Sequence, residues 1–126
     1  MLGIGVDIVS IKRVNDSIER SGKVFVDAVF TPAEQSLAGS HSNPVACYAK
    51  IFAAKGAIFK CFGIDDREHN LKPTDINIGE EECGAPLPTL SGALAQVAKE
   101  RGVTKVFLSV SYETDYAVAT AAIEKK

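Results

Sequence analysis

Three charged side chains stand in segments where charge is unusual, and each could bind an ion or a phosphate. Asp7 lies within the β-branched stretch at residues 2–9, and Lys55 and Lys60 lie within the largely apolar stretch at 50–63. A carboxylate in a strand suits a hard cation, and lysines that are costly to bury unpaired suit a phosphate. The plainer alternatives are a strand-edge aspartate bonded to a turn and lysines whose stems lie along the surface. From the residues alone both interpretations stay open.

Gly56 stands between the two lysines, although glycine inside a helix is about 1 kcal/mol less favourable than alanine. Everything around it predicts one continuous helix, with Asn43 as N-cap, Pro44 at the first helical position and Gly63 as the left-handed residue at its end. Apolar residues cover most of this helix, so we expect it in the middle of the fold. The glycine therefore needs a structural reason.

The stretch LGIGVDIV at residues 2–9 predicts a strand. Alternation gives it an apolar face and a face that is bare except for one carboxylate: Ile4, Val6 and Ile8 against Gly3, Gly5 and Asp7. Where glycines line a strand, a ligand or another backbone can approach closely. GIGVDI is not a dinucleotide fingerprint, because position 8 holds Ile8 where a third glycine is needed.

Helix caps and alternation predict the rest of the chain. From Ser10 an amphipathic helix carries Arg13 and Arg20 along one edge, and Thr31 and Glu34 form a capping box that starts the next helix. After a polar loop, the predicted elements are a strand at 74–81, a second strand following the turn at 82–87, a helix at 91–102 opened by Ser91, and strands at 105–112 and 115–124. The order β-α-α-α-β-β-α-β-β is α+β with a mostly antiparallel sheet.

Composition limits what the chain can be. At 126 residues, 46% hydrophobic and 24% charged, it is expected to form one globular domain over 1–126. No apolar run reaches the roughly 18 residues needed to cross a membrane, and a cytoplasmic location is expected. Cys47, Cys61 and Cys83 lack metal-site spacing and are expected to be free thiols, two of them in the core.

The net charge of −2 is unevenly distributed. Residues 1–63 hold seven Lys and Arg against five Asp and Glu, whereas residues 64–126 hold seven against eleven. The first half is the better candidate for meeting an anion, but the bias is too small for a nucleic-acid binder. His41 and His69 lie in polar loops and are expected at the surface. Ser109 and Ser111 share one face of their strand, with Tyr112 on the opposite face.

Five stretches taken together resemble a known family. They are GIGVDIVSIKRV, FTPAE, FAAKGAIFKCFG, DINI followed by GAP, and LSVSYETDYAVATAAIE, and they span nearly the whole chain in order. This set resembles the holo-acyl-carrier-protein synthases, the small 4′-phosphopantetheinyl transferases. The resemblance implies a homotrimer with active sites between its subunits. It also implies transfer of the phosphopantetheine arm of coenzyme A to a serine of an acyl carrier protein, in fatty acid biosynthesis, with magnesium on the pyrophosphate.

The resemblance also assigns roles to residues. It implies that Asp7 binds magnesium and is catalytic with Lys60, while the family's second metal ligand, a glutamate directly after FAAK, is replaced by Gly56. Two further departures are Ile51, where a basic residue is usual although Lys50 is adjacent, and Tyr112, where the S-x-S-H signature has histidine. The residues implied to bind coenzyme A are Lys55, Lys60, Gly84, Pro86, Ser109, Ser111 and Tyr112. Those implied to meet the acidic carrier protein are Lys12, Arg13 and Arg20.

These departures leave three hypotheses. The first is an active transferase in which Asp7, the pyrophosphate and water complete the magnesium shell. The second is a catalytically impaired homologue that binds a carrier protein or coenzyme A without dependence on magnesium. The third is an accidental substitution at Gly56, for which restoring the glutamate should restore the rate, although Ile51 and Tyr112 make a single change an incomplete explanation.

Overall fold

The computed structural model describes residues 2–63, 70–81 and 84–125. Its elements are, in chain order, β1 (Gly3–Ser10), α1 (Ile11–Ser21), α2 (Lys23–Val29), α3 (Pro32–Gly39), α4 (Pro44–Phe62), the 3-10 helix η1 (Pro73–Asp75), β2 (Ile76–Glu80), β3 (Pro86–Leu90), α6 (Gly92–Glu100), β4 (Val103–Tyr112) and β5 (Tyr116–Lys125). The predicted α+β class is confirmed. The structure adds α2 and η1, which neither caps nor alternation had predicted.

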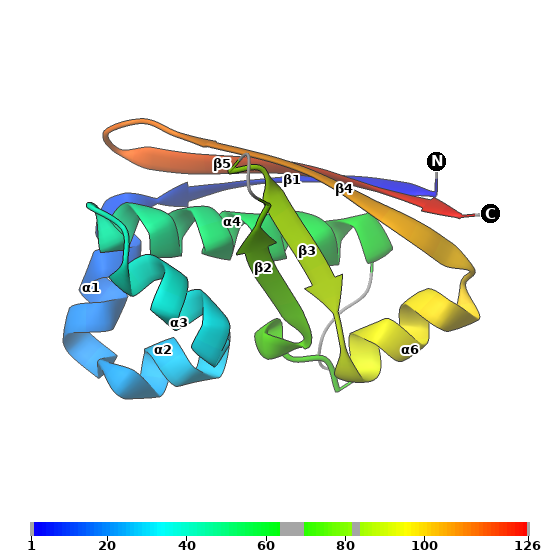
Figure 1. Ribbon diagram of the computed structural model, residues 1–126, viewed down its shortest axis with the longest axis horizontal. Helices are drawn as coiled ribbons and strands as arrows, with labels where there is room; N and C mark the ends of the chain where they lie inside the picture. The colour runs from blue at the N-terminus through cyan, green and yellow to red at the C-terminus, as the bar shows by residue number, and fades with distance from the viewer. Residues whose placement is uncertain (1, 64–69, 82–83, 126) are drawn as a thin grey trace.

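Two antiparallel sheets and one long helix form the centre of the molecule. The larger sheet has the order β1-β5-β4, and β2 pairs with β3 in a separate two-stranded sheet. Figure 1 shows α4 running beneath the larger sheet, with α1, α2 and α3 clustered at one end and α6 at the other. Small side chains on the inner face of β5 are buried and let the helix approach closely: Ala117, Ala119 and Ala121.

α4 is the central helix that its apolar pattern predicted. The side chain of Asn43 accepts a hydrogen bond of 3.2 Å from the backbone N–H of Ala46, and Pro44 lies in the first turn. At the other end Gly63 has a φ of 62°, in the left-handed region that favours glycine. The helix is buried along most of its length, so it fixes the positions of the strands packed on it.

The apolar face of β1 points away from the core. Ile4, Val6 and Ile8 are 64%, 56% and 66% exposed, whereas the face with the glycines lies on α4. The outer sheet face, as we call this surface, consists of Ile4, Val6, Ile8, Phe107, Tyr116 and Val118, all of them substantially exposed. A contiguous apolar surface of this kind is typical of an interaction site.

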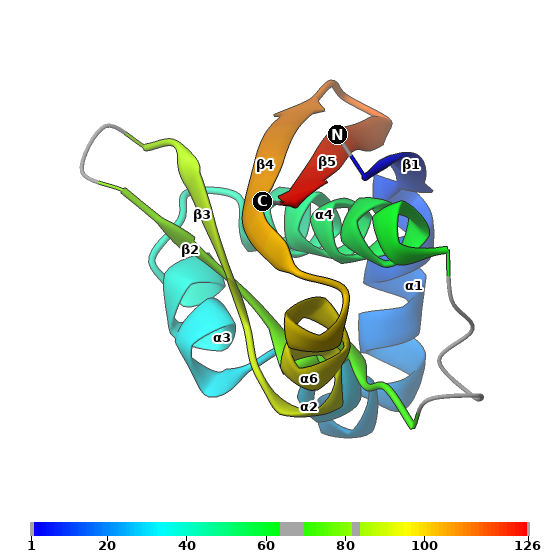
Figure 2. The ribbon, with the colours of Figure 1, turned by 90° about the vertical axis from the view of Figure 1, so that its right-hand side faces the viewer.

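The start of α6 differs from the prediction. Ser91 stands at the N-cap position, but its hydroxyl donates to the backbone carbonyl of Asp75 at 3.3 Å and makes no bond to the helix. The carboxylate of Asp75 accepts instead from the N–H of Leu94, at 3.3 Å, so a residue 19 positions earlier caps α6. Figure 2 views the molecule from the α6 end, with the larger sheet above α4 and the two-stranded sheet to its left.

The structure tests the predictions made for the cysteines and for one histidine. Cys47 and Cys61 are buried free thiols, as predicted, while Cys83 and His69 lie outside the described residues. His41 is not an isolated surface residue, because it is partly buried and pairs with Glu80 at 3.3 Å. None of the helices in the described ranges is both long enough and apolar enough to span a membrane.

Candidate functional site

Asp7 lies where β1 meets α4. Its Oδ1 accepts a hydrogen bond of 3.0 Å from Nζ of Lys60, which also donates to the backbone carbonyl of Val6 at 3.0 Å. The side chain of Asp7 is 21% exposed and that of Lys60 is 58% exposed. The two residues that the family resemblance makes catalytic are therefore in direct contact, at a place that solvent can reach.

A surface pocket opens beside Asp7, between the end of β1 and α1. Arg13 and Ser17 of α1 line it together with Asp7 and with Phe52 of α4. The first turn of α1 is fixed by Ser10, whose hydroxyl accepts from the backbone N–H of Arg13 at 3.3 Å. The pocket therefore combines the carboxylate of Asp7 with a guanidinium, and guanidinium groups suit an anionic, phosphate-bearing substrate.

The donor atoms around Asp7 do not form a metal site of their own. Magnesium needs six oxygen ligands, and proteins usually supply one or two carboxylates. Gly56, at the position of the family's second ligand, has no side chain, and Asp7 is already paired with Lys60. Within residues 2–63, 70–81 and 84–125, no group of three or more His, Cys, Asp or Glu is placed to hold a metal ion. The residues present therefore do not fit a metal ion resident in the free protein.

A second pocket lies between α4 and the two-stranded sheet. Lys50 and Ile51 of α4 line it together with Gly84 and Pro86. The Nζ atom of Lys50 lies 5.1 Å from the centre of the Tyr112 ring, a cation–π contact. Lys50, the basic residue adjacent to Ile51, is thus held over the ring that stands where the family signature has histidine. This pocket shares no lining residue with the pocket at Asp7.

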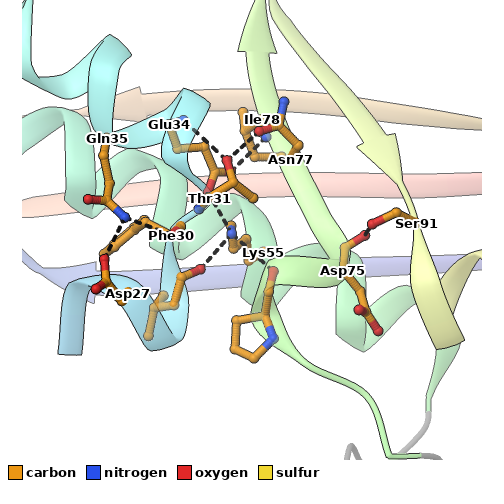
Figure 3. Close-up of polar contacts among 12 residues, drawn as sticks. Asp27, Phe30, Thr31, Glu34, Gln35, Lys55, Asp75, Asn77, Ile78 and Ser91 are labelled. Atoms are coloured by element: carbon orange, nitrogen blue, oxygen red, sulfur yellow. Dashed lines mark hydrogen bonds and ion pairs between the residues drawn. The ribbon is translucent and has the colours of Figure 1, made fainter. Parts of the chain in front are cut away.

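Lys55 lies at neither pocket. Its Nζ pairs with Oε1 of Glu34 at 2.7 Å and donates to the backbone carbonyls of Val29 at 2.6 Å and Pro73 at 3.0 Å (Figure 3). The side chain is 3% exposed, and burial lowers the pKa of Lys55 although Glu34 acts in the opposite direction. All three ammonium protons are committed to protein acceptors. The predicted contact of Lys55 with a phosphate group does not fit this arrangement.

Glu34 is the partner that the sequence did not identify. Oε1 accepts from the backbone N–H of Thr31 at 2.8 Å, which confirms the capping box, and Oε2 accepts from the N–H of Ile78 at 2.7 Å. A lysine in an apolar helix signals that an acceptor must exist. The spacing of residues could not indicate which acidic residue it is.

Of the remaining predicted site residues, Arg13 lines the pocket at Asp7, and the two serines and the other two basic residues line neither pocket. Ser109 and Ser111 are exposed on the outward side of β4, opposite Thr120 and Val118 of β5. On α1, three basic residues are exposed: Lys12, Arg13 and Arg20, of which Lys12 pairs with Asp16 at 3.1 Å. A single chain therefore distributes the predicted coenzyme A residues over separate surfaces: Asp7, Lys60 and Gly56 lie together at one place, and Gly84 and Pro86 line a pocket at another.

The fold, and the carboxylate and lysine where the first strand meets the central helix, can now be compared with known proteins. The sequence model of the 4′-phosphopantetheinyl transferase superfamily matches residues 3–121. The chain belongs to that superfamily and, within it, to the holo-[acyl-carrier-protein] synthases. A curated holo-[acyl-carrier-protein] synthase of Desulforudis audaxviator (strain MP104C) is 42% identical over 121 residues, which cover 96% of this chain and 91% of the relative.

Solved structures agree with this assignment. The crystal structure of holo-[acyl-carrier-protein] synthase from Neisseria meningitidis has a TM-score of 0.90 at 35% identity, covering 99% of each chain. The Helicobacter pylori holo-[acyl-carrier-protein] synthase, solved in complex with coenzyme A, has a TM-score of 0.80 at 28% identity, covering 96% of this chain and 99% of the other. The resemblance inferred from the five motifs is confirmed.

Proposed function

We propose that this chain transfers the 4′-phosphopantetheine group of coenzyme A to a serine of an acyl carrier protein. The observation that carries the proposal is the 42% identity to a holo-[acyl-carrier-protein] synthase over 96% of this chain. In this reaction the serine Oγ bonds to the phosphorus that carries the pantetheine arm. The bond from that phosphorus to the leaving 3′,5′-ADP breaks, and the hydroxyl proton is released to water.

Lys60 is the group that stabilises the leaving 3′,5′-ADP in this proposal. Negative charge grows on the leaving group as the phosphorus–oxygen bond breaks, and a fixed cation at that point lowers the barrier. The ammonium of Lys60 is held by Asp7 and by the carbonyl of Val6. These bonds use two of its three protons, and the side chain remains 58% exposed. A proton is thus left to bind a phosphate oxygen.

Magnesium enters the proposal together with the substrate. Asp7 offers it one carboxylate, and Gly56 offers no ligand. Magnesium dehydrates reluctantly and commonly binds through one carboxylate, substrate phosphates and water. Asp7 would be the residue of this chain that holds the ion, and the ion would neutralise part of the charge on the diphosphate of coenzyme A.

A homotrimer would complete the site. The outer sheet face exposes six large apolar or aromatic side chains, which favours burial against another copy of the chain. The pocket at Asp7 and the pocket at Gly84 and Pro86 share no lining residue. We expect the seam between copies to bring one pocket of each kind together, so that residues of two subunits bind one coenzyme A.

α1 is the expected docking surface for the carrier protein. Lys12, Arg13 and Arg20 are exposed on it, and Arg13 lines the pocket at Asp7. An acidic carrier protein steered to these charges would bring its serine beside Asp7 and Lys60. With this partner, the proposed setting of the reaction is fatty acid biosynthesis in the cytoplasm.

The test is a transfer assay with coenzyme A, magnesium and an apo carrier protein. Mass spectrometry of the carrier should show one added phosphopantetheine group, and formation of 3′,5′-ADP should match it in amount. Asp7→Asn should lose most of the rate, whereas Asp27→Asn, which alters an exposed aspartate of α2 in an ion pair with Lys23, should keep it. No transfer to any of several carrier proteins at high magnesium would refute the proposal.

The catalytically impaired homologue remains a second candidate, because Gly56 provides no second carboxylate. It predicts that the carrier protein or coenzyme A binds with the same affinity in the presence and absence of magnesium, without transfer. Calorimetry distinguishes the two candidates, since binding of coenzyme A that depends on magnesium favours the enzyme.

A further inference from the structure

β1 and α4 lie very close together. A side chain on one of them at this contact fits only where the other has no side chain opposite it. A Cβ atom added to Gly3 would come closer than 3.0 Å to the carbonyl oxygen of Cys61, and one added to Gly5 would do the same at Ala57. Real Cβ atoms essentially never make contacts this short. The two glycines therefore set the small distance between strand and helix.

Asp7 is the next inward-facing residue of β1, and it carries a side chain into the same narrow space. The helix supplies the room, because a Cβ atom on Gly56 would overlap Oδ2 and Cγ of Asp7. Gly56 has no positive φ, so its backbone conformation does not require glycine. The carboxylate of Asp7 thus occupies the space that a side chain at position 56 would need, and Gly56 leaves it there despite a cost of about 1 kcal/mol relative to alanine.

The position over Gly56 brings Asp7 to Lys60. Lys60 lies one helical turn beyond Gly56, its Nζ is 3.0 Å from Oδ1 of Asp7, and its bond to the carbonyl of Val6 fixes the ammonium in place. The carboxylate therefore already has a positive partner within the protein. A side chain at position 56 would require this carboxylate to shift from its present place beside Lys60.

We propose that Gly56 is a positioning residue for Asp7, and that the Asp7–Lys60 ion pair takes the place of a divalent cation in the free protein. Without substrate, the chain then has no magnesium site, and Lys60 is the cation presented to an incoming diphosphate ester. The inference rests on the proposed function only in naming the diphosphate. The ion pair and the absence of a resident metal are properties of the chain by itself.

A double-mutant cycle tests the positioning role. Unfolding in urea is compared for the native chain, Asp7→Asn, Lys60→Met and the double variant, first with Gly56 and then in the Gly56→Ala background. We expect an interaction between Asp7 and Lys60 with Gly56 and its loss with Gly56→Ala. A general loss of stability from alanine would leave the interaction unchanged, so equal interaction in both backgrounds, or none with Gly56, would overturn the role.

Titration with Mn²⁺, followed by electron paramagnetic resonance, tests the absence of a resident metal. The native chain without coenzyme A should bind no stoichiometric Mn²⁺. Gly56→Glu should gain saturable binding, because it adds a carboxylate and displaces Asp7 from Lys60, whereas Gly56→Gln, of the same size but uncharged, should not. Saturable Mn²⁺ binding by the native chain that disappears in Asp7→Asn would overturn the proposal, as would a folded Gly56→Glu that binds no Mn²⁺.

Both experiments omit coenzyme A and the carrier protein. Failure of the transfer assay would therefore leave their outcome unaffected, and a resident metal in the native chain would leave the transferase proposal standing. Should Gly56→Glu not fold, the double-mutant cycle and the native titration still decide the matter.

Discussion

The ammonium of Lys55 lies 2.7 Å from a carboxylate oxygen of Glu34, and both side chains are buried. The lysine comes from the middle of α4 and the glutamate from the first turn of α3, while the other oxygen of the glutamate accepts from the backbone of Ile78 in β2. The ion pair of Glu34 and Lys55 thus connects the N-terminus of α3, the central helix α4 and the strand β2. Because every partner is used internally, this lysine belongs to the scaffold and Lys60 is left to meet the substrate.

Replacing Lys55 by methionine should cost much of the stability of the fold. Glu34 would become an uncompensated buried charge, and the carbonyls of Val29 and Pro73 would lose their donor. Removing one partner of a buried pair costs about 3–5 kcal/mol, whereas an exposed pair is worth about 0–1 kcal/mol. Urea unfolding should therefore show a large loss for Lys55→Met and a small one for Lys60→Met. Equal losses would contradict the different burial of the two pairs.

A charge on the outer sheet face should separate the subunits of the proposed homotrimer. Val6→Lys places an ammonium on that face, in the middle of β1, where burial against another copy would leave it unpaired. Sedimentation should show a shift from trimer to monomer. Val24→Lys is the control, because Val24 is 79% exposed on α2, away from the sheet. A native chain that is monomeric, or a trimer that persists in Val6→Lys, would rule out this face as the interface.

Removing the Tyr112 ring should weaken coenzyme A binding by releasing Lys50. A cation–π contact at an exposed site is worth about 0.5–1 kcal/mol, which corresponds to about a two- to fivefold change in affinity. Tyr112→Leu should raise KM for coenzyme A by this factor with kcat less affected, and Tyr112→Phe, which keeps the ring, should not. An unchanged KM in Tyr112→Leu would mean that Lys50 needs no support from the ring.

The buried thiols should resist modification until the protein unfolds. Burial raises the pKa of Cys47 and of Cys61 from the ordinary value of 9.0, so both remain uncharged where an exposed thiol would ionise. Iodoacetamide near pH 9 should modify them slowly in the native chain and quickly in denaturant, as peptide mapping would show.

The raised pKa values of the two thiols also predict how the stability of the fold changes with pH. The thiols of the unfolded chain ionise first, from about pH 9, so the folded chain then holds more protons and its stability falls as the pH rises further. This fall should be smaller in a variant with Cys47→Ala and Cys61→Ala. Rapid alkylation of both thiols in the native chain would contradict their burial.

The sequence by itself determined the local structure and the family. Asn43 and Gly63 delimit α4, Thr31 and Glu34 form their capping box, and the five motifs occur in family order, because each depends on residues within one or two helical turns or on a quoted string. It also indicated that the glycines of β1 face something close, which is the backbone of α4. α2 was missed, since its sequence KVFVDAV contains three β-branched valines and no side-chain cap at its start.

Only the tertiary structure decided which charges meet. Lys60 bonds to Asp7 across 53 positions, Glu34 bonds to Ile78 across 44, and Lys55 reaches the carbonyl of Val29 across 26. Such contacts depend on how elements pack, and no local spacing contains that information. For the same reason the sequence could describe Gly56 as a missing ligand but not as the space that Asp7 occupies, because that space exists only once β1 lies on α4.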